Sequence, residues 1–188
     1  IFSYVHEHGY KINNSTTAVL SEYLGSDLSK ITNEIAKLML ASKKEKEITI
    51  ELIEHHIGIS KDYNVFELHN ALGRKDVTKA NKIINYFSED TKNHHIIPIL
   101  SSLFSFFQKV LVYHFLEDKS SQSVASNLKV NPFFANQYQI ASRNYTKKQL
   151  FYVFKLLKEY DLKSKGVNNK STKQIGLLKE LNFKILHT

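Results

Sequence analysis

Helical periodicity is the feature that most restricts what this chain can fold into. Apolar residues recur at spacings of three and four along most of the sequence, as in Leu28, Ile31 and Ile35, which places them on one face of a helix. Helix breakers are scarce, with 6 Gly and 2 Pro in 188 residues, and no segment shows the alternation typical of a strand. We therefore predict an all-α fold.

The first 60 residues contain four short helical patterns, and we expect them to form one small helical domain. The patterns cover residues 1–8, Ser15–Leu24, a stretch from Ser26 or Asp27 to about Leu38, and Ile50–Ile57. Helices shorter than about 12–15 residues are marginal in isolation, so these must stabilise one another by packing. The polar, aperiodic stretch Ile59–Asn64 is the predicted linker, which leaves residues 64–188 for a second domain.

The second domain is predicted to be a helical bundle. We expect helices at Val65–Leu72, from Asp76 to Phe87, from Pro98 to about Leu116, at Ser121–Leu128, from Pro132 to Ser142, after a capping box at Thr146–Gln149, and at Lys173–Leu186. The helix after Pro98 is the most apolar. Its circumference is mostly covered by Leu100, Leu103, Phe104, Phe107, Leu111 and Phe115, so we expect it at the centre of the bundle. Polar residues interrupt it too often for us to expect a membrane span.

The residue types needed for most enzymatic or metal chemistry are missing or badly spaced. There is no cysteine, no phosphate-binding GxxxxGK[ST] loop and no GxGxxG motif. Carboxylates lie in charged runs that suit solvent, where a catalytic pKa shift is not expected. The histidine pairs are adjacent or two apart, whereas zinc ligands on one helix face lie three or four apart; they are His6 and His8, His55 and His56, and His94 and His95. We predict no catalytic residue, no cofactor and no metal site.

The formal net charge of +8 favours acidic partners, although a solvated lysine surface accounts for it equally well. One segment, Ser121–Asn136, has the outline of a helix-turn-helix, with a turn at Lys129–Asn131. In a DNA reader the second helix presents polar and basic groups to base edges. Here its first turn would be Phe133 and Phe134, which suit a core better. A helix-turn-helix DNA-binding protein is therefore kept as the alternative function.

Four segments, taken in order, resemble the delta subunit of the bacterial DNA polymerase III clamp loader. They are the opening IFSYVHEHGYKI (Ile1–Ile12), EYLGSDLSKITNEIAKL (Glu22–Leu38), NVFELHNALGRKD (Asn64–Asp76) and VASNLKVNPFFANQYQIASRNYTKKQL (Val124–Leu150). The resemblance rests on this succession, which covers nearly the whole chain, rather than on any one motif.

The resemblance implies a small AAA+-type lid in residues 1–60 and a helical collar, the oligomerisation domain, in residues 64–188. It implies a cytoplasmic protein of DNA replication, not bound to membrane, that joins the other clamp-loader subunits through the collar. Contact with the sliding clamp would belong to an N-terminal domain preceding Ile1, so we expect this chain to be a C-terminal fragment. The parent complex, a DNA polymerase holoenzyme, would also hold primer–template DNA.

Two further expectations follow from the resemblance. ATP-hydrolysing lids carry an arginine at the start of the third helix, and the corresponding Asp27–Lys30 has none, which fits a subunit that does not hydrolyse ATP. Basic residues beside an aromatic side chain could face DNA, since aromatic rings stack on unpaired bases. The candidates for this DNA-facing side of the collar are Phe133, Arg143, Lys163, Lys165 and Asn168.

Overall fold

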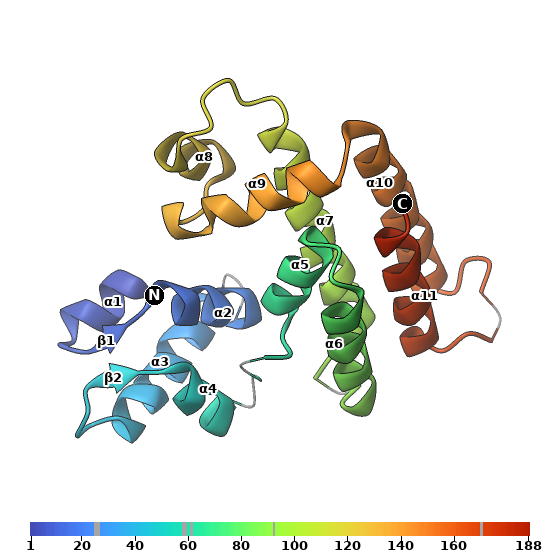
Figure 1. The fold of residues 1–188 in the computed structure, drawn as a ribbon. Helices are drawn as coiled ribbons and strands as arrows, with labels where there is room; N and C mark the ends of the chain where they lie inside the picture. Colours follow the sequence, from blue (N-terminus) through green and yellow to red (C-terminus); the bar gives the residue numbers. More distant parts are fainter. Residues whose placement is uncertain (25–26, 58–59, 61, 92, 170) are drawn as a thin grey trace. The chain divides into compact units, whose positions relative to one another are not determined.

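The computed structural model describes residues 1–188 except 25–26, 58–59, 61, 92 and 170, and except the side chains of Glu22 and Phe133. The described residues form eleven α-helices, one short 3-10 helix and two strands of two residues each (Figure 1). The chain divides into two compact units, Ile1–Phe66 (unit 1) and Glu67–Thr188 (unit 2). The prediction of an essentially helical fold is confirmed.

Unit 1 consists of four helices around a core of its own. They are α1 (Phe2–Glu7), α2 (Asn14–Leu24), α3 (Leu28–Ala41) and α4 (Ile50–Ile57). The fully buried side chains include Val5, Leu20, Ile35, Leu38 and Ile53. The Asp27 carboxylate accepts a hydrogen bond from the Lys30 amide at 3.1 Å and so caps α3, because it satisfies one of the free N–H groups of the first turn.

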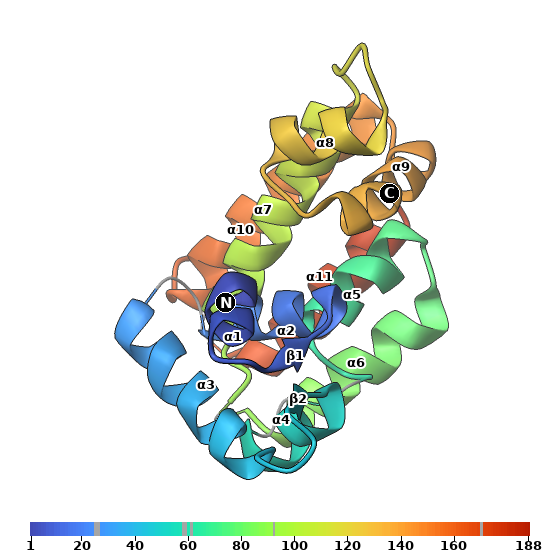
Figure 2. The same cartoon turned by 90° about the vertical axis from the view of Figure 1, so that its left-hand side faces the viewer.

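Two short strands correct the expectation that no strand would form. β1 (Lys11–Ile12) pairs in parallel with β2 (Glu47–Ile48), with Ile12 opposite Ile48 (Figure 2). Both isoleucines are buried in the core of unit 1. A strand of two residues is too short to show a period of two in the sequence, so this pairing left no pattern to detect.

Unit 2 is a helical bundle in which α7 occupies the central place. Its elements are α5 (Val65–Gly73, whose first two residues belong to unit 1), α6 (Val77–Glu89), α7 (Ile96–Tyr113), α8 (Ser121–Leu128), the 3-10 helix η1 (Pro132–Phe134), α9 (Ala135–Asn144), α10 (Lys147–Ser164) and α11 (Gln174–Leu186). Helix α7 contacts α8, α9, α10 and α11, and α10 also lies along α11 (Figure 1). The Asp76 cap and the Thr146–Gln149 capping box form as predicted.

Helix α7 is covered on one face only, which corrects the expectation that it is buried all round. Leu103 and Phe107 are buried, but Phe104 is 48% exposed. Phe115 was also expected on the buried surface of this helix. Helix α7 ends at Tyr113, before Phe115, and the Phe115 side chain is 63% exposed. By length and composition α7 could cross a membrane, yet its covered face packs inside unit 2, as in the core helix of a bundle.

The end of α5 is fixed to the junction between α9 and α10 by close packing. A Cβ on Gly73 would lie 3.2 Å from both the Ala141 Cβ and the Phe106 ring, so glycine allows the helices to approach. The Tyr145 hydroxyl, from the same junction, donates a hydrogen bond of 2.9 Å to the Leu72 carbonyl. Helix α5 ends at Gly73, one residue beyond the predicted range, and the left-handed residue that follows is Lys75, with φ of 54°.

Candidate interaction surface

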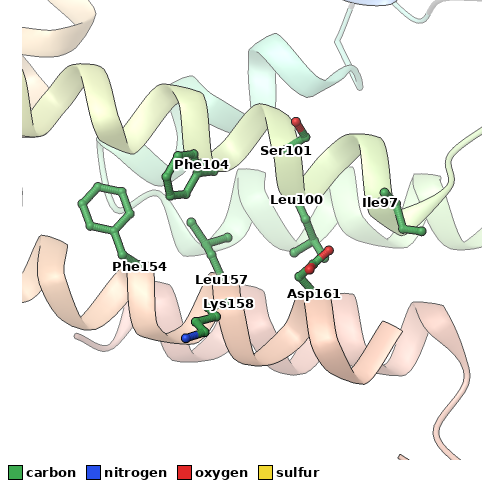
Figure 3. A pocket seen from close by; sticks show the side chains of 8 residues that line it. All are labelled: Ile97, Leu100, Ser101, Phe104, Phe154, Leu157, Lys158 and Asp161. Atoms are coloured by element: carbon green, nitrogen blue, oxygen red, sulfur yellow. The ribbon is translucent and has the colours of Figure 1, made fainter. Parts of the chain in front are cut away.

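A groove runs between α7 and α10 in unit 2 and has a cavity volume of about 520 Å³. Four side chains from each helix line it: Ile97, Leu100, Ser101 and Phe104 from α7, and Phe154, Leu157, Lys158 and Asp161 from α10 (Figure 3). Within each set the residues lie three or four apart, so each helix presents one face to the groove. We call this site the α7–α10 groove.

The floor of the α7–α10 groove is aliphatic and its rim is aromatic. Leu100 and Leu157 are buried, and they point toward the opposite helix (Figure 3). The rings of Phe104 and Phe154 meet across the groove, with centroids 5.4 Å apart. The half-exposed Ile97 lies at the other end. The groove therefore leaves apolar surface in contact with water, which is characteristic of a binding site.

Exposed aromatic surface continues beyond the groove toward the start of α10. Phe151, one turn before Phe154, is 62% exposed. One further turn back, the Lys147 ammonium lies 4.1 Å from the centroid of the exposed Phe115 ring. Phe104 of α7 contacts Phe154 of α10, and Phe115, just after α7, contacts Lys147 at the start of α10. Later residues of one helix thus face earlier residues of the other, so the two helices run antiparallel.

The basic residues near the groove belong mainly to α10, whereas α7 carries Lys109 alone. Residues 96–113 and 147–158 contain no Asp or Glu, and their five lysines are Lys109, Lys147, Lys148, Lys155 and Lys158. The first carboxylates of α10 are already paired. Glu159 contacts Lys163 at 2.7 Å, and Asp161 contacts Lys165 at 2.7 Å. The hydrogen bond from Lys163 lowers the pKa of Glu159, which keeps that carboxylate ionised and unsuited to proton donation.

The histidines pack on aromatic rings rather than forming a ligand cluster. His6 lies against Phe2 at 4.4 Å between centroids, and His94 stacks on Phe87 at 4.3 Å. His69 is buried, and its Nε2 lies 3.1 Å from the Ser102 hydroxyl. Among the residues that the structure describes, no three His, Cys, Asp or Glu side chains lie close enough to hold a metal ion.

The predicted DNA-facing residues do not come together in one place. Lys163 and Lys165 are each paired with an acidic residue one helical turn earlier, and Asn168 lies exposed just after α10. Arg143 is exposed at the end of α9, next to the opposite end of α10. Since α10 has 18 residues, it holds these two ends about 27 Å apart. The side chain of Phe133 is outside the described part, and DNA contact stays a prediction.

The segment proposed as a helix-turn-helix contributes Val124, Ala125, Leu128 and Ala135 to the core of unit 2. Its second helix begins at Ala135, after the 3-10 helix η1, rather than at Pro132 as expected. Tyr138 is buried in α9, which contacts α7. The only basic residue of Ser121–Asn136 is Lys129, which adopts the left-handed conformation that ends α8. The segment thus supplies a single positive charge for contact with DNA phosphates.

Sequence reasoning missed the α7–α10 groove, although it singled out the residues that form it. Leu100 and Phe104 were placed on the apolar helix expected at the centre of the bundle, on the strength of their periodicity. The available signal was the width of the apolar surface on α7, which exceeds the single stripe that a helix on the surface of a bundle needs to cover. An excess of that kind indicates either a fully buried helix or a second contact surface.

Comparisons with known proteins point to one family. The family model described as DNA polymerase III delta subunit, C-terminal domain, matches residues 62–179. DNA polymerase III subunit delta of Bacillus subtilis (strain 168) is 26% identical over 152 residues, which are 80% of this chain and 43% of that protein. The solved structure of the Bacillus subtilis DNA clamp loader delta protein (YqeN) is similar with a TM-score of 0.66 and 23% identity, over 100% of this chain and 54% of that one. The chain thus spans about half the length of these relatives.

Proposed function

The chain belongs to the DNA polymerase III delta subunit family, and we propose that it supplies the lid and the collar of a clamp-loader delta subunit. The resemblance seen in the order of sequence segments is thereby confirmed at the level of the family. The family match at residues 62–179 falls almost entirely within unit 2, which supports assigning unit 2 as the collar and unit 1 as the lid.

The collar's task in this proposal is to hold the subunit in the loader, and the observation that carries it is the α7–α10 groove. The groove exposes apolar side chains on the unit that carries the family match, and the described residues contain no group of His, Cys, Asp or Glu side chains that could hold a metal ion there. Apolar surface of this kind is stabilised when a protein partner covers it. Membership of this family supports a role in DNA replication in the cytoplasm.

The lid, in this proposal, does not take part in ATP hydrolysis. Asp27 is engaged in capping α3, and the Lys30 ammonium lies 5.6 Å from the centre of the Tyr23 ring. The segment Asp27–Lys30 contains no arginine that could reach a phosphate group. Opening of the sliding clamp would fall to the part of the relatives that this sequence does not span. Lys163, Lys165 and Asn168 remain candidate DNA contacts at one end of α10, separate from Arg143.

Size-exclusion chromatography of this chain with the other loader subunits of the same organism tests the proposal. We expect co-elution at micromolar concentrations, with each protein alone as the control. Separate elution of every subunit would contradict the collar assignment.

A gel-shift assay tests the helix-turn-helix alternative. Duplexes of different sequence should bind equally or not at all. Binding to one sequence alone, with a steep loss of affinity as salt is raised, would favour the alternative.

A further inference from the structure

We propose that the α7–α10 groove binds an amphipathic helix of another protein, one that carries carboxylates beside its apolar stripe. The inference rests on the proposed function in taking the partner to be another clamp-loader subunit. It adds the site of binding, the secondary structure of the occupant and the sign of its charge.

The shape of the groove fits a helix. Its walls are two antiparallel helices, and the lining together with the exposed Phe151 extends along α10 from Asp161 back to Phe151. Ten residues of helix cover about 15 Å, or nearly three turns, which is the span over which an amphipathic helix places anchors at positions i, i+3 or i+4, and i+7. The rings of Phe104 and Phe154 form a ridge that such anchors could flank.

A small ligand or an extended peptide fits the groove less well. Binding sites for small molecules hold a few convergent polar groups, whereas the polar lining here is Ser101, Lys158 and Asp161, the last already paired with Lys165. A peptide bound as an added β-strand needs a free sheet edge to supply main-chain hydrogen bonds. Both walls of the groove are helices, whose main-chain groups bond internally.

The charge of the walls determines the charge of the partner. Lys155 and Lys158 are exposed on α10 near the groove, with Lys147 and Lys148 farther along the same helix. The nearest carboxylates of α10, Glu159 and Asp161, are paired with Lys163 and Lys165. A partner helix with Asp or Glu beside its apolar stripe would complement this surface, while a basic helix would be repelled. A second copy of this chain is disfavoured for the same reason, since its net charge is +8 and its lysines would face these.

Two variants with matched controls test the site and the charge separately, using the full chain and the subunit that co-elutes with it. Phe104→Ser should weaken the complex about 10- to 100-fold, as is typical for loss of an aromatic anchor. The control is Phe183→Ser, because Phe183 is 59% exposed on α11, away from the groove. Lys155→Glu/Lys158→Glu should also weaken binding, by about tenfold or more at low salt, whereas Lys173→Glu/Lys179→Glu on the α11 side should not.

Dissociation constants measured by isothermal titration calorimetry at two salt concentrations distinguish the outcomes. Wild-type affinity in both groove variants would overturn this inference and leave the proposed function intact. Failure of the parent chain to bind any subunit would overturn both. If Phe104→Ser alone loses affinity, and neither the lysine reversal nor salt has an effect, the inference that the partner helix carries carboxylates would be overturned.

Two further measurements exclude other occupants. Sedimentation of the chain alone should show a monomer at micromolar concentration, and a dimer lost in Phe104→Ser would assign the groove to a second copy. Vesicles containing an anionic phospholipid should not bind the chain, and binding that Phe104→Ser abolishes would assign the groove to a membrane surface.

A photo-crosslinker placed at position 104 should react with a carboxylate-bearing helix of the partner; a basic or extended segment there would contradict the inference.

Discussion

Acid should destabilise unit 2 through one buried side chain, His69. Its ring stacks on Phe106, with centroids 4.9 Å apart, and its Nε2 lies within hydrogen-bond distance of Ser102. Burial, and to a smaller extent the nearby charge of Lys109, lowers the pKa of His69 from 6.5 to about 3. The folded protein therefore keeps this imidazole neutral at pH values where the unfolded chain protonates it.

The sign and the size of the effect follow from the two pKa values of His69. Between about pH 6.5 and pH 3 the unfolded state binds one proton more at His69 than the folded state. The free energy of unfolding therefore has its full value, as far as His69 is concerned, above this range, and it decreases as the pH falls through the range. About pH 5 lies roughly 1.5 units below the unfolded value. At about 1.4 kcal/mol per unit, this corresponds to about 2 kcal/mol less free energy of unfolding than at about pH 7.5.

The assay is urea unfolding followed by far-UV circular dichroism at about pH 7.5 and pH 5, for the parent chain and for His69→Gln. Gln cannot be protonated, so the variant should lose about 2 kcal/mol less between the two pH values, whatever its stability at neutral pH. Burial also lowers the pKa of His94, but that residue is present in both proteins and its contribution cancels. The exposed residue His95 supplies the control variant His95→Gln. An equal loss in the parent and in His69→Gln would refute the reasoning.

Three substitutions test the packing of unit 2 by urea unfolding. Tyr145→Phe should lower the free energy of unfolding by about 1–2 kcal/mol, because the buried Leu72 carbonyl loses its donor; no change would show that water replaces it. Gly73→Ala should destabilise by about 1–3 kcal/mol, because the added methyl meets side chains at 3.2 Å; a more stable variant would contradict this close approach. Lys129→Gly should stabilise by about 0.5–1 kcal/mol, since glycine adopts the left-handed conformation without strain, and a loss would indicate a side-chain contact at Lys129.

Local signals in the sequence predicted much of the fold. Asp76 and the pair Thr146 and Gln149 fixed the starts of α6 and α10, because capping depends only on residues within one turn. The first helical pattern was expected over residues 1–8, and α1 is followed by Gly9 with φ of 76°, a conformation that glycine adopts without strain. The predicted linker, Ile59–Asn64, lies partly outside the described residues and stays a prediction; the two compact units meet in the sequence between Phe66 and Glu67.

The features that sequence could not predict depend on which elements meet in space. Periodicity shows that Phe104 lies on an apolar face, but it cannot tell whether the chain itself or another protein covers that face. The separation of Arg143 from Lys165 depends on the direction in which α10 runs, which no local pattern encodes. The pairing of Ile12 with Ile48 brings together two segments that α2 and α3 separate in the chain.

That pairing has a consequence for the order in which unit 1 assembles. The Lys11 amide donates a 2.8 Å hydrogen bond to the Lys46 carbonyl, across a stretch of chain that contains both α2 and α3. Closing a loop of that size costs conformational entropy before the strands contribute any hydrogen bonds. The ladder should therefore be a late event in folding, formed when α2 and α3 have already condensed. From then on it joins the N-terminal turn to the turn before α4, so that neither can fray without opening the other.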